Sequence, residues 1–281
     1  MDATTIDWDT CVPVDMSTRA DGTIIVSAPR RHLYRQTRPV KEPQTWEQYL
    51  DSLPDWEKTL MQKTHEPVST RGLAEELRDA SSHIMIVSDG GAKDDKGYFG
   101  WIIGTKHEVL WEGQGPARGN PMTAQRAEAY GKLSWICFLK HYVAFLDIQV
   151  RCEVSSFCDN MGVIQQTPFS TSNTAREAIL PDYDILKEIK TQQENLRKLI
   201  PRLHQGNHVK GHQDKHKNFV ELPRPAQLNI LADNQATSEL AIHAGPMPSL
   251  EFPSCSAYLL NAGQLRSSQE VTLLRWKWSD F

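Results

Sequence analysis

The chain has 281 residues, of which 39% are hydrophobic and 23% charged, so it is long enough to bury the core of an ordinary domain. It contains no apolar run near the roughly 18 residues that a membrane-spanning helix needs. Its N-terminal residues include acidic side chains and lack the basic start and apolar stretch of a secretory signal. We therefore expect a soluble intracellular protein, cytoplasmic or nuclear. The net charge of −4 argues weakly against broad non-specific binding to nucleic acid, which needs a basic surface.

Residues 1–80 predict an N-terminal extension that contains a helical segment. Ile24-Ile25-Val26 predicts a short strand, and Arg30 to Pro43 predicts a basic, proline-flanked loop or arm. From Thr45 to Lys63 the apolar and aromatic side chains recur at intervals of three and four, which is the spacing of a helix. Pro54 is expected to divide this stretch into two short helices, because proline breaks a helix interior. We expect the aromatic face to pack on the next domain.

Residues 81–245 predict the main domain. Strands are predicted over 83–87, 98–104, 109–113, 148–157 and 203–209, and helices over 124–142, 182–199 and 226–241, the first of them capped by Thr123. Three successive strands with short turns predict an antiparallel meander. The strands and helices that alternate after it predict an α/β fold, a mixed sheet of antiparallel then parallel strands with helices on both faces. Trp101, Trp111 and Trp135 fall within these elements and are expected to pack in the core.

Residues 246–281 predict a C-terminal extension. It opens with a proline-rich linker, and strand-like runs follow at Ala257–Leu260 and Val271–Trp278. Asn261-Ala262-Gly263 has the composition of a turn, so a β-hairpin is expected here.

Neither the cysteines nor the histidines predict a zinc site. The cysteines are odd in number and form no C-x-x-C pair, which favours buried free thiols in a reducing compartment: Cys11, Cys137, Cys152, Cys158 and Cys255. Four histidines recur every fourth residue, and on a helix they would form a metal-binding stripe: His204, His208, His212 and His216. Gly206 and Gly211 interrupt this stretch and argue against a continuous helix.

Two carboxylates stand beside small residues. Asp89 follows a buried strand and precedes Gly90 and Gly91, where backbone without side chains suits a metal or a phosphate. Taken alone, the pattern favours an ordinary Asp-Gly turn residue. Glu128 lies on the core-facing, small-residue side of its helix, from which Arg126 and Lys132 are expected to point away. A carboxylate buried there is costly unless something positive meets it, and the alternative is a solvent-facing side chain.

Two further carboxylates have ordinary explanations as well. Asp159 follows a predicted strand, where either Asp159 or Asn160 is a possible cap of the next helix. Asp233 lies on the last helix, one turn after Asn229, and is alternatively a solvated helix residue. In a mixed sheet all four elements can converge at one edge. Four converging carboxylates repel one another unless divalent cations bind them, and oxygen-only ligation fits Mg²⁺ or Mn²⁺.

The order of these residues resembles ribonuclease H of type 1, and most closely the ribonuclease H domains of retroelement (reverse transcriptase) polyproteins. The matching segments are Ser88-Asp89-Gly90-Gly91-Ala92, Arg126-Ala127-Glu128-Ala129-Tyr130-Gly131, Cys158-Asp159-Asn160, Val209-Lys210-Gly211-His212-Gln213-Asp214 and Leu228-Asn229-Ile230-Leu231-Ala232-Asp233. The resemblance covers roughly residues 83–243. Each segment is short, but together they occur in the right order between the right predicted elements.

The resemblance implies a nuclease that hydrolyses the RNA strand of RNA–DNA hybrids with two Mg²⁺ or Mn²⁺ ions. It implies that Asp89, Glu128, Asp159 and Asp233 bind the metal and that His212 is a further catalytic residue. Contacts to the nucleic acid are expected at Gly90, Gly91, Asn160, Lys210 and Asn229. It also implies a possible partner, a reverse transcriptase or another retroelement domain.

The sequence departs from the cellular enzymes in two places. The loop from Lys215 to Pro225 between His212 and Asp233 is longer, and no basic protrusion for gripping the hybrid is evident. Phosphate contacts are instead expected from two basic stretches, one around Arg30–Arg38 and one over Arg202–Lys217, both of which are alternatively solvated loops. Two other functions stay open. One is a binding module that keeps the fold without cleaving, and the other is an integrase-like or recombinase-like nuclease, although such enzymes carry a glutamate on a late helix.

Overall fold

The computed structural model describes residues 45–119, 121–169, 181–215 and 217–240, together with 247, 250 and 252. It also describes the backbone of five short strands: β1 (Asp15–Thr18), β2 (Ile24–Ala28), β3 (Arg31–Arg35), β10 (Leu259–Asn261) and β11 (Gln264–Arg266). No helix in these described ranges is both long enough and apolar enough to cross a bilayer.

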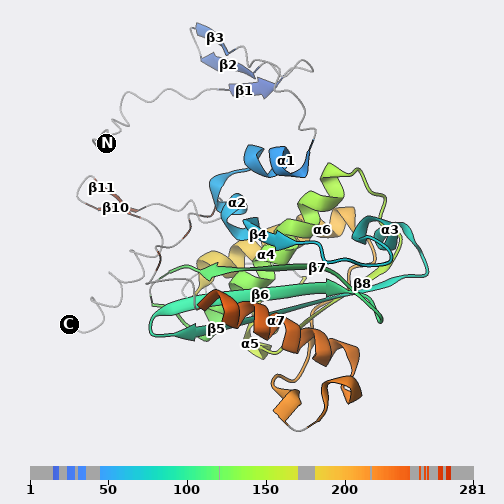
Figure 1. Ribbon diagram of the computed structural model, residues 1–281. Coiled ribbons are helices and arrows are strands. Elements are labelled where there is room, and N and C mark those ends of the chain that lie inside the picture. The colour runs from blue at the N-terminus through green and yellow to red at the C-terminus, as the bar shows by residue number, and fades with distance from the viewer. Residues whose placement is uncertain are drawn as a thin grey trace, which may run out of the picture.

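A six-stranded mixed sheet forms the centre of the molecule (Figure 1). Its strands lie in the order β4-β7-β6-β5-β8-β9, and their bounds are β4 (Lys63–His65), β5 (His83–Lys93), β6 (Lys96–Gly104), β7 (Val109–Ala117), β8 (Glu153–Cys158) and β9 (Asn207–His208). Strands β5, β6 and β7 pair antiparallel, whereas β8 runs parallel to β5 and β9 parallel to β8. This is the predicted meander followed by parallel strands, and it confirms the ribonuclease H-like α/β fold class.

Helices cover both faces of the sheet. Their bounds are α1 (Trp46–Ser52), α2 (Asp55–Met61), α3 (Leu73–Arg78), α4 (Ala124–Phe145), α5 (Met161–Gln166), α6 (Tyr183–Leu199) and α7 (Arg224–Leu240). Helix α4 packs on β5 with α6 behind it, and α7 packs on β5 and β6 from the opposite face (Figure 1). Side chains of β5 alternate accordingly: Ile84 and Ile86 join the core around α4, and Met85 and Val87 join the core around α7.

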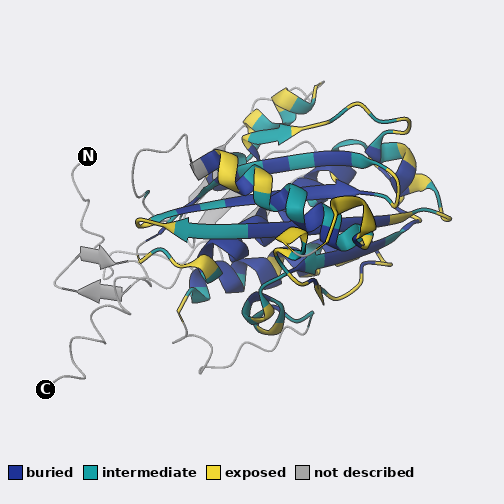
Figure 2. Ribbon diagram, turned by 60° about the horizontal axis from the view of Figure 1, so that its bottom comes forward, coloured by how far each residue is buried: buried dark blue, intermediate teal, exposed yellow. Residues whose placement is uncertain are grey.

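The burial of the central elements follows from this layering (Figure 2). Trp101, Trp111 and Trp135 are all buried, as predicted, and Trp101 donates a hydrogen bond to the Ser134 hydroxyl at 2.8 Å. The predicted helix cap is also present, because the Thr123 side chain accepts a hydrogen bond from the backbone nitrogen of Arg126.

The segment from Thr45 to Lys63 forms the two short helices expected from its spacing. Thr45 caps α1, and Pro54 stands immediately before α2. The aromatic face packs on α4, where the ring of Trp46 meets Phe138 and Tyr142 edge-on at 6.0 and 5.8 Å between centroids. The predicted packing of this face on the main domain is confirmed.

Several predicted boundaries are wrong. Part of the expected loop after residue 30 is strand β3, which pairs antiparallel with β2. Strand β8 begins only at Glu153, because Ile148 and Val150 alternate as core side chains of a segment that has no strand pairing. The expected strand over 203–209 shrinks to β9 and an isolated bridge between Leu203 and Val154. The short helix α5 begins directly after Asn160, where a helix cap was expected, but its range was not predicted.

The C-terminal hairpin forms around the expected turn, with Asn261 paired to Gln264. Its second strand is β11, nearer to the turn than the predicted run at 271–278, which lies outside the described residues.

Candidate metal-binding site

Two of the candidate carboxylates lie on neighbouring strands. The parallel pairing of β5 and β8 ends where Ser88 stands opposite Cys158. Asp89 and Asp159 therefore come directly after paired residues of two neighbouring strands. Asp89 does not end its strand as expected, since β5 continues to Lys93 through its pairing with β6. The end of the parallel pairing, and not the end of the strand, brings these two residues together.

Glu128 reaches the same place because α4 lies unusually close to β5. A Cβ at Gly90 would lie only 2.5 Å from the backbone nitrogen of Glu128, and one at Gly131 would lie 3.3 Å from the Asp89 carbonyl oxygen. These glycines let the two backbones approach. Glu128 is 4% exposed, so the solvent-facing alternative is excluded.

Asp233 comes from the opposite face of the sheet. Helix α7 crosses β6 at Gly100, where a Cβ would contact the carbonyl oxygen of Ala232. One turn before Asp233, the Asn229 side chain is 2% exposed, and its Nδ2 donates to Asp89 Oδ2 at 3.4 Å. This bond connects α7 to β5 and orients the Asp89 carboxylate, whose other oxygen accepts from the Gly90 nitrogen at 2.7 Å.

The pKa values show that these carboxylates feel one another's charge. Burial, together with the negative charges of Asp159 and Asp233, raises the pKa of Asp89 to about 7. Burial also holds the pKa of Glu128 well above its usual range, with contributions from Cys158, Asp89 and Asp159. Crowded acidic groups of this kind are stabilised by bound protons or by a cation.

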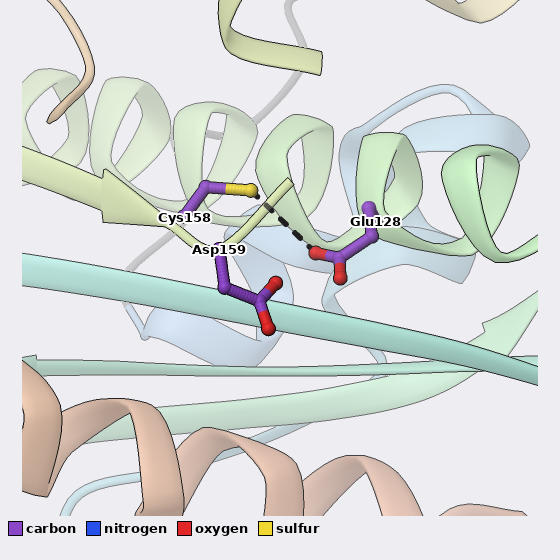
Figure 3. A group of neighbouring side chains, drawn as sticks. All are labelled: Glu128, Cys158 and Asp159. Carbon is purple, nitrogen blue, oxygen red and sulfur yellow. Dashed lines mark hydrogen bonds between the residues drawn. The ribbon is translucent and has the colours of Figure 1, made fainter. Parts of the chain in front are cut away.

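A thiol lies among the acidic groups. Cys158 is 4% exposed, and its Sγ donates to Glu128 Oε2 at 3.6 Å. Figure 3 shows these two side chains pointing toward one another, with the Asp159 carboxylate beside them. One potential ligand atom from each of Glu128, Cys158 and Asp159 lies within 4.8 Å of the others. The sequence predicted Cys158 only as a buried free thiol, although its position directly before Asp159 was a signal for a role at the site.

Two basic side chains of α4, Arg126 and Lys132, are buried and have partners other than Glu128. Arg126 forms ion pairs with Asp182 and Asp184 at 3.0 and 2.8 Å, joining the starts of α4 and α6. Lys132 Nζ donates to Thr167 Oγ1 at 2.6 Å, and burial lowers the pKa of this lysine to about 8. Both residues hold the helices that position Glu128.

Asp159 is not the cap of the following helix. Asn160 performs that role, since its Oδ1 accepts from the Val163 nitrogen at 3.2 Å. The Asp159 carboxylate instead packs against Gly211, where a Cβ would contact its Oδ2, and its carbonyl oxygen lies 3.2 Å from His208 Nε2.

His212 is exposed and has a φ of 51°, one residue after the glycine that touches Asp159. Lys210, on the other side of that glycine, is exposed as well. The histidine-rich stretch is irregular, as predicted, with a 3₁₀ turn at Gln213–Lys215. Arg202, at its start, forms an ion pair with Glu153.

The residues present fit a hard divalent cation. Mg²⁺ and Mn²⁺ prefer oxygen ligands, and Asp89, Glu128, Asp159 and Asp233 offer carboxylate oxygens. The buried Asn229 also has an Oδ1 with no hydrogen-bond partner among the described residues, although its Nδ2 is bound to Asp89. A cation would offset the repulsion that raises the pKa of Asp89 and Glu128.

No protein-family model matches the chain, and no curated protein sequence matches it. Similar solved structures include the N-terminal RNase H domain of a Mycobacterium tuberculosis protein, at 19% identity and a TM-score of 0.39, covering 58% of this chain and 96% of that one. LC11-RNase H1 in complex with an RNA/DNA hybrid matches at 20% identity and a TM-score of 0.38, covering 57% of this chain and 97% of that one. Prototype foamy virus protease-reverse transcriptase matches at 19% identity and a TM-score of 0.38, covering 63% of this chain and 22% of that one.

Proposed function

We propose that the chain is a divalent-metal-dependent endonuclease that hydrolyses the RNA strand of RNA–DNA hybrids. The observation that carries the proposal is the position of the carboxylates. Asp89 and Asp159 directly follow the paired residues of β5 and β8, Glu128 lies on α4 against Gly90, and α7 reaches Asp89 through Asn229, one turn before Asp233. Two Mg²⁺ or Mn²⁺ ions held by this set would supply an activated water and charge stabilisation for the departing 3′ oxygen.

The chain's own residues have distinct tasks in this proposal. Asn229 and the Gly90 nitrogen fix both oxygens of Asp89. Gly211 lets the segment that carries His212 lie against Asp159. In its exposed position, His212 is suited to exchange a proton with the reacting phosphate or the product, because an imidazole can both accept and donate a proton. Contacts to 2′-hydroxyls in the shallow minor groove would select the RNA strand.

The late helix distinguishes this proposal from an integrase-like nuclease. In this proposal α7 contributes Asp233, whose charge acts on Asp89. Its glutamate, Glu239, is instead buried in an ion pair with Lys63 at 2.6 Å, where it ties α7 to β4. The acid on the late helix is therefore an aspartate, which supports the ribonuclease H assignment.

The direct test is cleavage of a hybrid whose RNA strand is labelled, with Mg²⁺ or Mn²⁺, by the wild type and by Asp89→Asn. We expect cleavage by the wild type and a loss of at least about a hundredfold in the variant, because each carboxylate removed weakens the whole centre. A substrate of double-stranded DNA serves as the control and should stay intact.

Two results would contradict the proposal. If the wild type binds the hybrid but cleaves it with neither metal, the chain is a binding module of the same fold. If Asp89→Asn cleaves as fast as the wild type, Asp89 does not belong to the active centre. If a reverse transcriptase or another retroelement domain helps to bind the hybrid, adding that domain should increase the rate of cleavage.

A further inference from the structure

The thiol of Cys158 gives the candidate site a donor that Mg²⁺ does not favour. We propose that Cys158, Glu128 and Asp159 form a binding site for a thiophilic divalent ion such as Zn²⁺, overlapping the carboxylate centre. The inference deepens the proposed metal site and rests on it. Thiolate sulfur selects softer ions, whereas carboxylate and water suit Mg²⁺ and Mn²⁺. The same pocket would therefore accept two chemically different classes of cation.

The spacing of the donors supports this site. In tetrahedral zinc sites the Zn–S distance is about 2.3 Å and the Zn–O distance about 2.1 Å, which places sulfur and oxygen about 3.6 Å apart. Cys158 Sγ and Glu128 Oε2 lie 3.6 Å apart. A ligand atom of Asp159 lies within 4.8 Å of both, so a small movement of this half-buried side chain completes a set of three. Figure 3 shows the three side chains gathered at the end of β8.

A fourth potential donor lies on the neighbouring strand, opposite Cys158. Ser88 is 1% exposed, and its Oγ has no hydrogen-bond partner among the described residues. Ser88 stands opposite Cys158 in the parallel pairing of β5 and β8, and its Cβ faces α4 at Gly131. Cys158 reaches Glu128 on the same helix, so both side chains share this face of the sheet. A buried hydroxyl left without a partner is costly, and a cation beside the thiol would satisfy it.

Binding exchanges one bond for another without any change of oxidation state. The Cys158 sulfur loses its proton to solvent and forms a bond to the ion, and the hydrogen bond from the thiol to Glu128 is replaced by a bond from the ion to the same carboxylate. Because Glu128 and Asp159 also belong to the proposed Mg²⁺ centre, the two classes of ion compete for these oxygens.

The test is titration of the metal-free full chain with Cd²⁺, a thiophilic probe, read by the ultraviolet charge-transfer absorption of a cadmium–thiolate bond. We expect the Cys158→Ser variant to show weaker absorption than the wild type. The Cys152→Ser variant should absorb like the wild type, and it is a matched control because Cys152 is also buried but lies outside the site. Glu128→Gln should weaken binding of the Cys158-dependent portion about tenfold or more. Circular dichroism of each variant confirms that it folds.

Equal absorption in the wild type and Cys158→Ser would overturn the proposal, as would a Cys158-dependent band that Glu128→Gln leaves unchanged. Excess Mg²⁺ should diminish the Cys158-dependent band, and a band indifferent to Mg²⁺ would show that the two sites do not overlap and would contradict the inference. None of these readouts requires cleavage of a hybrid. Absence of nuclease activity with an intact cadmium band would therefore count against the proposed function alone.

Discussion

Individual residues at the site illustrate what sequence can and cannot reveal. The four carboxylates could be singled out as candidates because each stands in a short segment, and the segments follow one another in a recognisable order. Cys158 and Ser88 could not, since only the register between β5 and β8 shows that both face α4. A shift of one residue would have turned them to the opposite face. The buried state of Lys132 was missed for a related reason, because α6 and the end of α5 cover a side of α4 that helical spacing alone leaves exposed.

The close approach of α4 to β5 is testable at a single glycine. Gly90→Ala would place a Cβ 2.5 Å from the Ala127 carbonyl carbon and from the Glu128 nitrogen, two helix backbone atoms that cannot rotate away. We expect the free energy of unfolding to fall by about 1–3 kcal/mol, as in other overpacked cores. Urea unfolding followed by circular dichroism measures it.

Gly72→Ala is the matched control, because the nearest atom to its added Cβ is a flexible glutamate oxygen at 3.6 Å. It should leave the free energy of unfolding within about 0.5 kcal/mol of the wild type. Equal effects of the two substitutions would mean that the contact between α4 and β5 is looser than the structure shows.

At the scale of elements, α1 and α2 are attached to α4 by a buried polar network as well as by aromatic packing. The Tyr49 hydroxyl lies 2.9 Å from His141 Nδ1. Glu57 Oε1 lies 3.0 Å from His141 Nε2 and 2.7 Å from Lys140 Nζ. The sequence predicted these helices and their aromatic face, but not the network, since its members are about 90 residues apart and look like ordinary surface residues.

This network makes the docking of α2 sensitive to acid. Burial opposes ionisation of Glu57, but hydrogen bonds from His141 and Lys140 outweigh it and lower the pKa below its ordinary value of 4.5. The folded state therefore holds the charged form more firmly than the unfolded state does. The resulting stabilisation is fully present above pH 4.5 and is lost as the pH falls through the lower, folded-state pKa.

Glu57→Gln should thus lower the free energy of unfolding at pH 7 by about 3 kcal/mol, because it leaves Lys140 without its carboxylate. The difference from the wild type should shrink as the pH falls below 4. Urea unfolding at a series of pH values checks this, with the exposed Glu47→Gln of α1 as the control. A difference that stays constant from pH 7 to pH 3 would show that Glu57 contributes through packing and not through charge.

At the scale of the whole molecule, the order of elements was enough to predict the sheet. Three strands with short turns pair as a meander, and alternating strands and helices then extend the sheet in parallel. Boundaries failed where buried apolar residues lie outside any ladder, as at Ile148 and Val150. Strand β4 was also missed, because Lys63–His65 has a polar composition and joins the sheet only through its pairing with β7.

The central claim is that Asp89, Glu128, Asp159 and Asp233 form one centre for divalent cations. Mn²⁺ binding to the metal-free full chain, followed by the loss of the free-ion signal in electron paramagnetic resonance, tests it most directly. We predict that the wild type binds Mn²⁺ and that Asp89→Asn, Glu128→Gln, Asp159→Asn and Asp233→Asn each weaken binding about tenfold or more. Asp51→Asn, an exposed carboxylate of α1, should bind like the wild type. Mn²⁺ binding that is unchanged in all four variants would contradict the claim.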